Sequence, residues 1–85
     1  MSNIQQTSIL AYQELSNLSQ KRRLVYEAIL NLGEACNLDI AYFLKRPINT
    51  ITPRTNELVK LGLVTESKKD FSARTGKKVI YWRAI

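Results

Sequence analysis

The side chains best suited to recognising another molecule gather between residues 49 and 60. Threonine and asparagine can both donate and accept hydrogen bonds there. Arg54 can hold guanine O6 and N7 together, a contact that discriminates between bases by about 1–3 kcal/mol. Such residues also occur on any solvated helix, so their meaning depends on the element that carries them. The candidate base-reading residues are Asn49, Thr50, Thr52, Pro53, Arg54, Asn56 and Lys60.

A second group of cations lies further along the chain, among small polar residues that are typical of a loop. Cations on a hairpin suit phosphates or a neighbouring minor groove better than they suit the reading of base edges. This group consists of Lys68, Lys69, Arg74, Lys77 and Lys78.

The charge distribution supports an acidic partner. The net charge is +6, but residues 1–44 hold three basic and four acidic residues, whereas residues 45–85 hold ten basic and three acidic ones. The two segments therefore carry −1 and +7, and both candidate groups lie in the second. A polyanion, such as double-stranded DNA, is the obvious partner class. A basic surface that serves solubility alone would show the same net charge.

The residue types argue against an enzyme. The chain has no histidine, which is the commonest general base, and its single cysteine excludes a zinc finger or ribbon. Its three glycines form no phosphate-binding loop. The acidic residues are scattered over different elements. We therefore expect no catalytic residue, no metal site, no cofactor and no small-molecule substrate.

Two short helices joined by a tight turn must position the first group. In residues 37–44, Leu38, Ala41 and Leu44 recur at intervals of three, which predicts a helix with Asn37 as its N-cap. Pro47 prevents this helix from continuing. The next helix ends before Gly62, and its start is open. The apolar spacing favours a start near residue 49, whereas Pro53 would suit the first helical position with Thr52 as the cap.

The flanking segments complete a small α+β domain. An apolar face predicts a helix from residue 18 or 19 to residue 31, with a minimal edge strand at 34–36. Alternation predicts strands at 63–68 and 78–83, joined by a long loop at 69–76. The expected core comprises Leu24, Ile29, Ile40, Leu44, Ile51, Leu58, Leu61, Leu63 and Trp82, with Cys36 as a small buried residue.

These motifs resemble a known family. Asn-x-Asp-Ile-Ala-x-x-Leu, followed by Ile-Asn-Thr-Ile-Thr-Pro-Arg-Thr-Asn-Glu-Leu-Val-x-x-Gly-Leu-Val, looks like the core of MarR-like winged helix-turn-helix DNA-binding domains. With Arg-Thr-Gly-Lys-Lys-Val-Ile-Tyr-Trp, the chain is most similar to small winged-helix proteins encoded by phages and prophages. The resemblance covers roughly residues 19–83. It implies a three-helix core, a short preceding helix and a C-terminal two-stranded β-wing.

The remaining expectations concern organisation and partners. Residues 1–18 should form an arm with a short helix, which either closes the core or serves dimerisation, and residues 19–85 the DNA-binding domain. A lone thiol and the absence of an apolar membrane span predict a cytoplasmic protein. The leading hypothesis is a sequence-specific DNA-binding transcription regulator of bacterial or phage origin, with a homodimer left open. The alternatives are a protein-interaction or assembly module and a nonspecific nucleic-acid binder.

Overall fold

The computed structural model describes residues 18–85, in which three helices precede a β-hairpin. Helix α2 (Gln20–Leu32) begins after Ser19, whose Oγ accepts a hydrogen bond from the Arg22 N–H at 3.3 Å. It ends at Gly33, whose φ of +79° is easily adopted only by glycine. The predicted N-terminal arm helix lies outside the described residues.

The predicted pair of helices is present, with shifted boundaries. Helix α3 (Asn37–Leu44) is preceded by Cys36 as the N-cap, so Asn37 is the first helical residue and not the cap. Instead, the Asp39 carboxylate accepts a hydrogen bond from the Cys36 N–H. Lys45 takes a left-handed conformation at the end of α3, and the chain then turns through Arg46.

Helix α4 (Ile48–Lys60) begins before either start expected from the sequence. Pro53 therefore lies inside the helix, where it has no N–H to donate to the carbonyl one turn earlier. The helix survives because its apolar residues are anchored on both sides of the proline: Ile51 and Leu58 are both fully buried. At its other end Gly62 has a φ of +78°, as expected for the residue that follows a helix.

Strands β1 (Val64–Phe71) and β2 (Lys78–Ala84) pair antiparallel. The strand prediction was correct in type but too short for β1, because residues 69–71 pair with β2 and only residues 72–77 form the loop. The predicted edge strand is a single bridge, in which the Ala35 and Trp82 backbones exchange two hydrogen bonds of 3.0 and 2.8 Å. The register shifts between Glu66 and Lys68, which marks a β-bulge.

The core lies where α2, α3 and α4 meet the base of the hairpin. Of the predicted core, Ile29, Ile40, Ile51, Leu58 and Leu63 are buried, whereas Leu24, Leu44 and Trp82 are half-buried. Leu61 was assigned wrongly: it is 41% exposed, because the helix ends there and the side chain leaves the inward stripe. Cys36 is buried, as expected.

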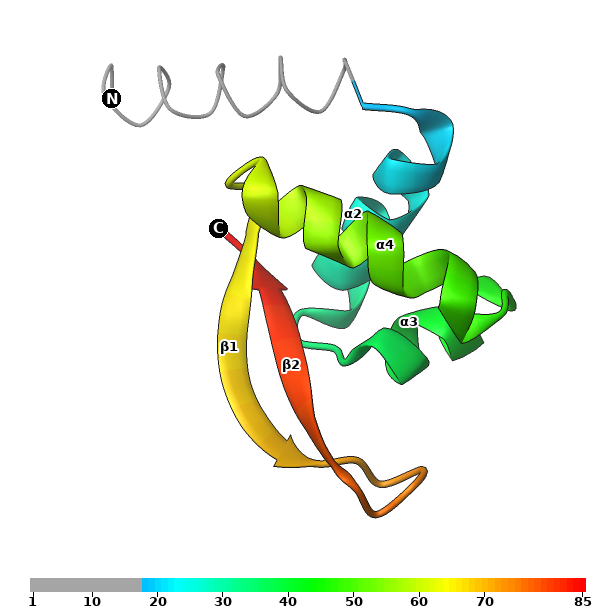
Figure 1. Cartoon of the computed structure of the whole chain (residues 1–85), viewed down its shortest axis with the longest axis vertical. Helices are drawn as coiled ribbons and strands as arrows, with labels where there is room; N and C mark the ends of the chain where they lie inside the picture. The colour runs from blue at the N-terminus through cyan, green and yellow to red at the C-terminus, as the bar shows by residue number, and fades with distance from the viewer. Residues whose placement is uncertain (1–17) are drawn as a thin grey trace.

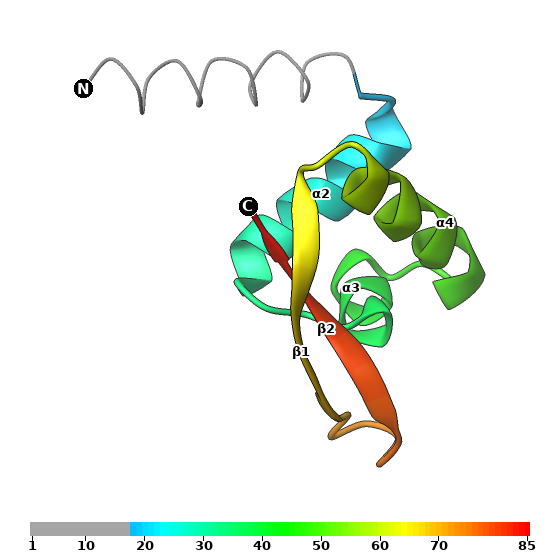
Figure 2. The same ribbon diagram turned by 60° about the vertical axis from the view of Figure 1, so that its left-hand side comes forward.

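The three helices pack together on one side, and the hairpin extends from them past α3 (Figures 1 and 2). Helix α4 contacts α2, α3 and β1. The α+β class and the winged arrangement expected from the sequence are therefore confirmed. None of the helices in residues 18–85 combines the length and the apolar character needed to cross a membrane.

Candidate nucleic-acid interface

The outer face of α4 carries most of the predicted base-reading residues. Inward positions are taken by Ile51, Thr55 and Leu58, all buried. Five of the seven candidates are exposed, and Thr52 and Arg54 are half-buried. The exposed ones are Asn49, Thr50, Pro53, Asn56 and Lys60.

The hydroxyl groups of Thr50 and Thr52 already donate hydrogen bonds to backbone carbonyls at the start of α4. The Thr50 hydroxyl donates to the Pro47 carbonyl at 2.7 Å, and the Thr50 N–H donates to the same oxygen at 3.0 Å. The Thr52 hydroxyl donates to the Ile48 carbonyl and accepts from the Asn37 side chain, both at 3.4 Å. Asn49 and Asn56 thus have the amide groups with the greatest freedom to contact a partner.

Arg54 lies in an ion-pair network that the sequence did not reveal. Its Nε is 3.0 Å from Glu57 Oε1, outside hydrogen-bonding geometry, and its Nη2 donates to Glu57 Oε2 at 3.4 Å. Glu57 also accepts a 2.8 Å hydrogen bond from Arg22 Nε on α2. Glu57 therefore links α2 to α4 and holds the Arg54 side chain along α4, toward the C-terminal end of the helix.

Acidification should weaken this network. The hydrogen bond from Arg22 holds the pKa of Glu57 below its usual range. A carboxyl with a lowered folded-state pKa adds stability above its unfolded pKa, and this is lost as the pH falls through the folded value. Between about pH 6 and pH 3, around the ordinary glutamate pKa of about 4.3, the Tm of wild type should fall further than that of Glu57→Gln. Parallel Tm curves in a calorimetric pH series would contradict this expectation.

The bulge decides which hairpin cations face the helices. Directly paired residues of two strands point to the same side of the sheet, and successive residues alternate. Lys69 pairs with Ile80, and Phe71 pairs with Lys78, so these four share the side of Trp82, which packs against the core. Lys68 pairs with Tyr81 and points to the other side.

Lys68 accordingly makes its contacts on the outer side of the hairpin. Its Nζ lies 3.3 Å from Glu34 Oε1, 3.7 Å from Asp70 Oδ2 and 5.1 Å from the centre of the Tyr81 ring. The hydrogen bond to Glu34 raises the pKa of Lys68. Glu34 also accepts a hydrogen bond from the Ser67 hydroxyl, within the bulge. This cluster fixes the bulge against the link between α2 and α3.

The hairpin loop holds the other two predicted cations in different ways. Arg74 contacts α3, where its Nε donates to Asp39 Oδ1 at 3.2 Å and its guanidinium lies 4.1 Å from the centre of the Tyr42 ring. Lys77 is exposed. Among residues 18–85, Lys69, Lys77 and Lys78 make no ion pair.

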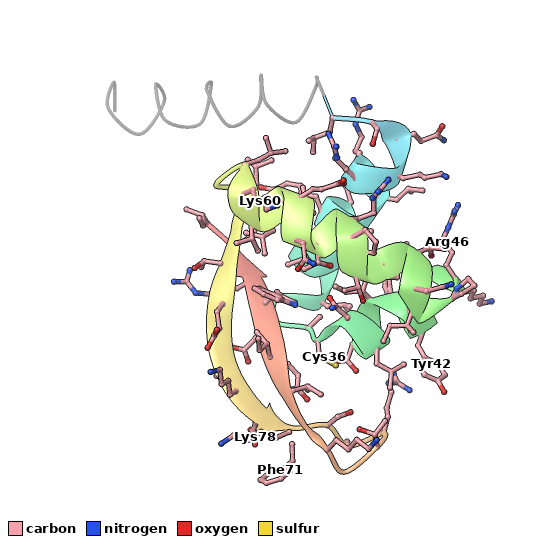
Figure 3. The ribbon with its side chains drawn as sticks, viewed as in Figure 1. Cys36, Tyr42, Arg46, Lys60, Phe71 and Lys78 are labelled. Atoms are coloured by element: carbon pink, nitrogen blue, oxygen red, sulfur yellow. The ribbon has the colours of Figure 1, made fainter. Side chains whose placement is uncertain are left out.

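A groove of about 510 Å³ separates the helices from the hairpin. Ile48 and Asn56 line it from α4, and Lys77, Lys78 and Trp82 line it from the hairpin side. The buried Trp82 Nε1 has no hydrogen-bond partner within the described part of the chain. In Figure 3, Lys78 is labelled near the distal end of the hairpin and Lys60 at the C-terminal end of α4. The α4 surface and the cationic hairpin therefore border one hollow.

The sequence reasoning missed Arg46. It is exposed in the turn between α3 and α4, beside the first turn of α4 (Figure 3). Its position just before α4 is the signal in the sequence that could have found it. Residues 18–85 hold no cluster of three metal-ligating side chains.

Comparisons with known proteins place this geometry in a known fold. Neither a protein-family model nor a curated protein sequence matches the chain. Among solved structures, a possible transcriptional regulator from Methanosarcina mazei Go1 superposes with a TM-score of 0.67 at 16% identity, over 88% of this chain and 62% of its own. YusO from Bacillus subtilis gives 0.63 at 15% identity, over 100% and 64%.

A third structure, an apo mutant of ZitR from Lactococcus lactis, gives a TM-score of 0.58 at 20% identity, over 99% of this chain and 60% of its own. The chain thus spans between 60% and 64% of the length of these structures. At such low identity the likeness establishes the fold alone. The chain has the winged helix-turn-helix fold that its sequence resembles.

Proposed function

We propose that this chain binds double-stranded DNA sequence-specifically, as a transcription regulator of bacterial or phage type. In this proposal α4 enters the major groove, and the hairpin meets phosphates or the adjacent minor groove. The observation that carries it is the shared hollow, which Asn56 of α4 lines on one side and Lys77 and Lys78 line on the other. Lys69 points to the same side of the hairpin. The description of the Methanosarcina mazei structure as a possible transcriptional regulator agrees with the proposal.

The charge distribution supports DNA over a neutral partner. Residues 45–85 carry a net charge of +7, and the three hairpin lysines have no carboxylate partner within residues 18–85. Unpaired cations release condensed counterions when they meet phosphates, which supplies affinity without sequence preference. Sequence preference must then come from α4, with Asn49, Asn56 and Arg54 as the side chains that reach base edges.

Selection of bound duplexes from a random pool tests the proposal. A sequence-specific protein should enrich a common motif, and the enriched duplex should outcompete nonspecific DNA. Enrichment without a motif would indicate a nonspecific binder. No measurable binding to duplex DNA at low salt would reject the proposal and favour a protein-interaction module.

Arg54→Ala should relax the preference at particular base pairs by about tenfold, the effect of losing one bidentate contact of about 1–3 kcal/mol. For this contact Arg54 must leave Glu57, whose charge is still compensated by Arg22. The matched control is Lys69→Ala, which should weaken all duplexes alike. Competition binding with single-base variants of the selected site makes the measurement. An unchanged preference profile in Arg54→Ala would remove Arg54 from the reading face.

A further inference from the structure

The hairpin is fixed to the helical body at its base. The Ala35 and Trp82 backbones exchange two hydrogen bonds there, and Trp82 packs against the core. Beyond Trp82, strand β2 runs four more residues to Lys78, roughly 13 Å at about 3.3 Å per residue. The distal half of the hairpin therefore extends past the core (Figure 2). Its position relative to α4 depends on any contact made near its tip.

Arg74 provides that contact. Its Nε donates to Asp39 Oδ1 at 3.2 Å, and its guanidinium stacks 4.1 Å from the centre of the Tyr42 ring. Asp39 is itself fixed in the first turn of α3, because its other carboxylate oxygen accepts from the Cys36 N–H at 3.3 Å. Tyr42 lies toward the hairpin loop in Figure 3. Both partners of Arg74 thus belong to a packed helix.

The loop can transmit this attachment to its lysines. Ser72 is only 2% exposed, and its N–H donates to the Lys77 carbonyl at 2.8 Å. The Gly76 N–H donates to the Ser72 carbonyl at 2.8 Å, and the Arg74 N–H donates to the Ser72 Oγ at 3.2 Å. Residues 72–77 therefore form one hydrogen-bonded turn, and holding Arg74 holds Lys77.

We infer that Arg74 is a positioning residue that ties the hairpin tip to α3 and so sets the separation between the hairpin lysines and α4. This differs from the sequence-based prediction that Arg74 contacts a phosphate itself. The inference rests on the proposed DNA-binding function for its effect on affinity. The attachment itself belongs to the free protein and is measured there.

Asp39→Asn separates positioning from simple electrostatics, because the two predict opposite signs. Removing a negative charge from a DNA-binding domain should strengthen DNA binding if charge alone matters. If Asp39 holds the hairpin through Arg74, the isosteric change should instead weaken binding roughly two- to fivefold, the range of one exposed ion pair. The matched control is Asp70→Asn, which removes a hairpin carboxylate that does not contact α3 and should not weaken binding.

Two further measurements complete the test. Arg74→Ala should weaken binding while leaving the slope of log affinity against log salt unchanged, whereas a lost phosphate contact would flatten it by about 0.9. In the free proteins, both Arg74→Ala and Asp39→Asn should speed amide hydrogen exchange at Ser72 and Gly76, with exchange at Leu58 unaffected.

The outcomes distinguish this inference from the proposed function. Faster loop exchange together with weaker binding and an unchanged slope supports the positioning role. Unchanged loop exchange, tighter binding by Asp39→Asn, or a flattened slope in Arg74→Ala overturns it. Failure of the wild type to bind any duplex rejects the DNA-binding function, and with it the effect on affinity. The exchange data would then still decide whether Arg74 fixes the hairpin.

Discussion

Leu58→Ala should destabilise the fold by about 2–5 kcal/mol, the usual cost of truncating a fully buried leucine. Leu58 has no exposed surface, lies in the last turn of α4 and packs in the same core as Ile29, Ile40 and Ile51. A domain of this size has a total stability of only about 5–10 kcal/mol. The substitution should therefore remove a large part of it.

Urea unfolding at neutral pH measures this loss directly. The neighbouring Val59 is 37% exposed on the same helix, so Val59→Ala is a matched control that should cost under about 1 kcal/mol. Equal urea midpoints for the two variants would mean that the inward face of α4 is assigned wrongly.

The fold could be predicted from the sequence because its signals are local. The period of three and four around Ile40 and Leu58, the stop at Gly62 and the alternation after it each depend on residues close in the chain. The errors fall at element ends. Leu61 fits the apolar stripe of α4, but the helix ends at that residue, and a stripe read from sequence does not show where a helix ends.

Candidate site residues could be chosen from the sequence, but their arrangement could not. One extra residue in β1 places Lys68 on the outer side of the hairpin and Lys69 on the inner side, the reverse of simple alternation from Glu66, since a shift of one residue exchanges the two faces of a strand. The sequence of residues 66–70 has no feature that predicts the bulge.

The ion pairs of Arg22 and Arg74 could not be predicted for a different reason. Arg74 meets Asp39 across 35 positions of sequence, and Arg22 meets Glu57 across the same separation. Such pairs depend on how elements pack in three dimensions. Charge counting from the sequence treats every arginine as available to a partner, whereas Arg22 and Arg74 each have a carboxylate oxygen within 3.2 Å.

The hairpin lysines give the sharpest test of how this protein would hold DNA. The double variant Lys77→Ala/Lys78→Ala should weaken binding to every duplex and flatten log affinity against log salt by roughly 1.8, about 0.9 for each lost phosphate contact. Both side chains line the hollow that α4 borders. Titrations at several salt concentrations, read by fluorescence anisotropy, make the measurement.

Arg83→Ala is the matched control for that double variant. Arg83 follows Trp82 in β2 and therefore points to the outer side of the hairpin, where its charge helps to lower the pKa of Glu34. Removing it takes away one positive charge from the same strand but none from the hollow, so the salt slope should stay at the wild-type value. If Arg83→Ala flattened the slope as much per charge as the lysine variant, DNA would be responding to net charge alone. That result would mean that the hollow between α4 and the hairpin is not the DNA-binding face.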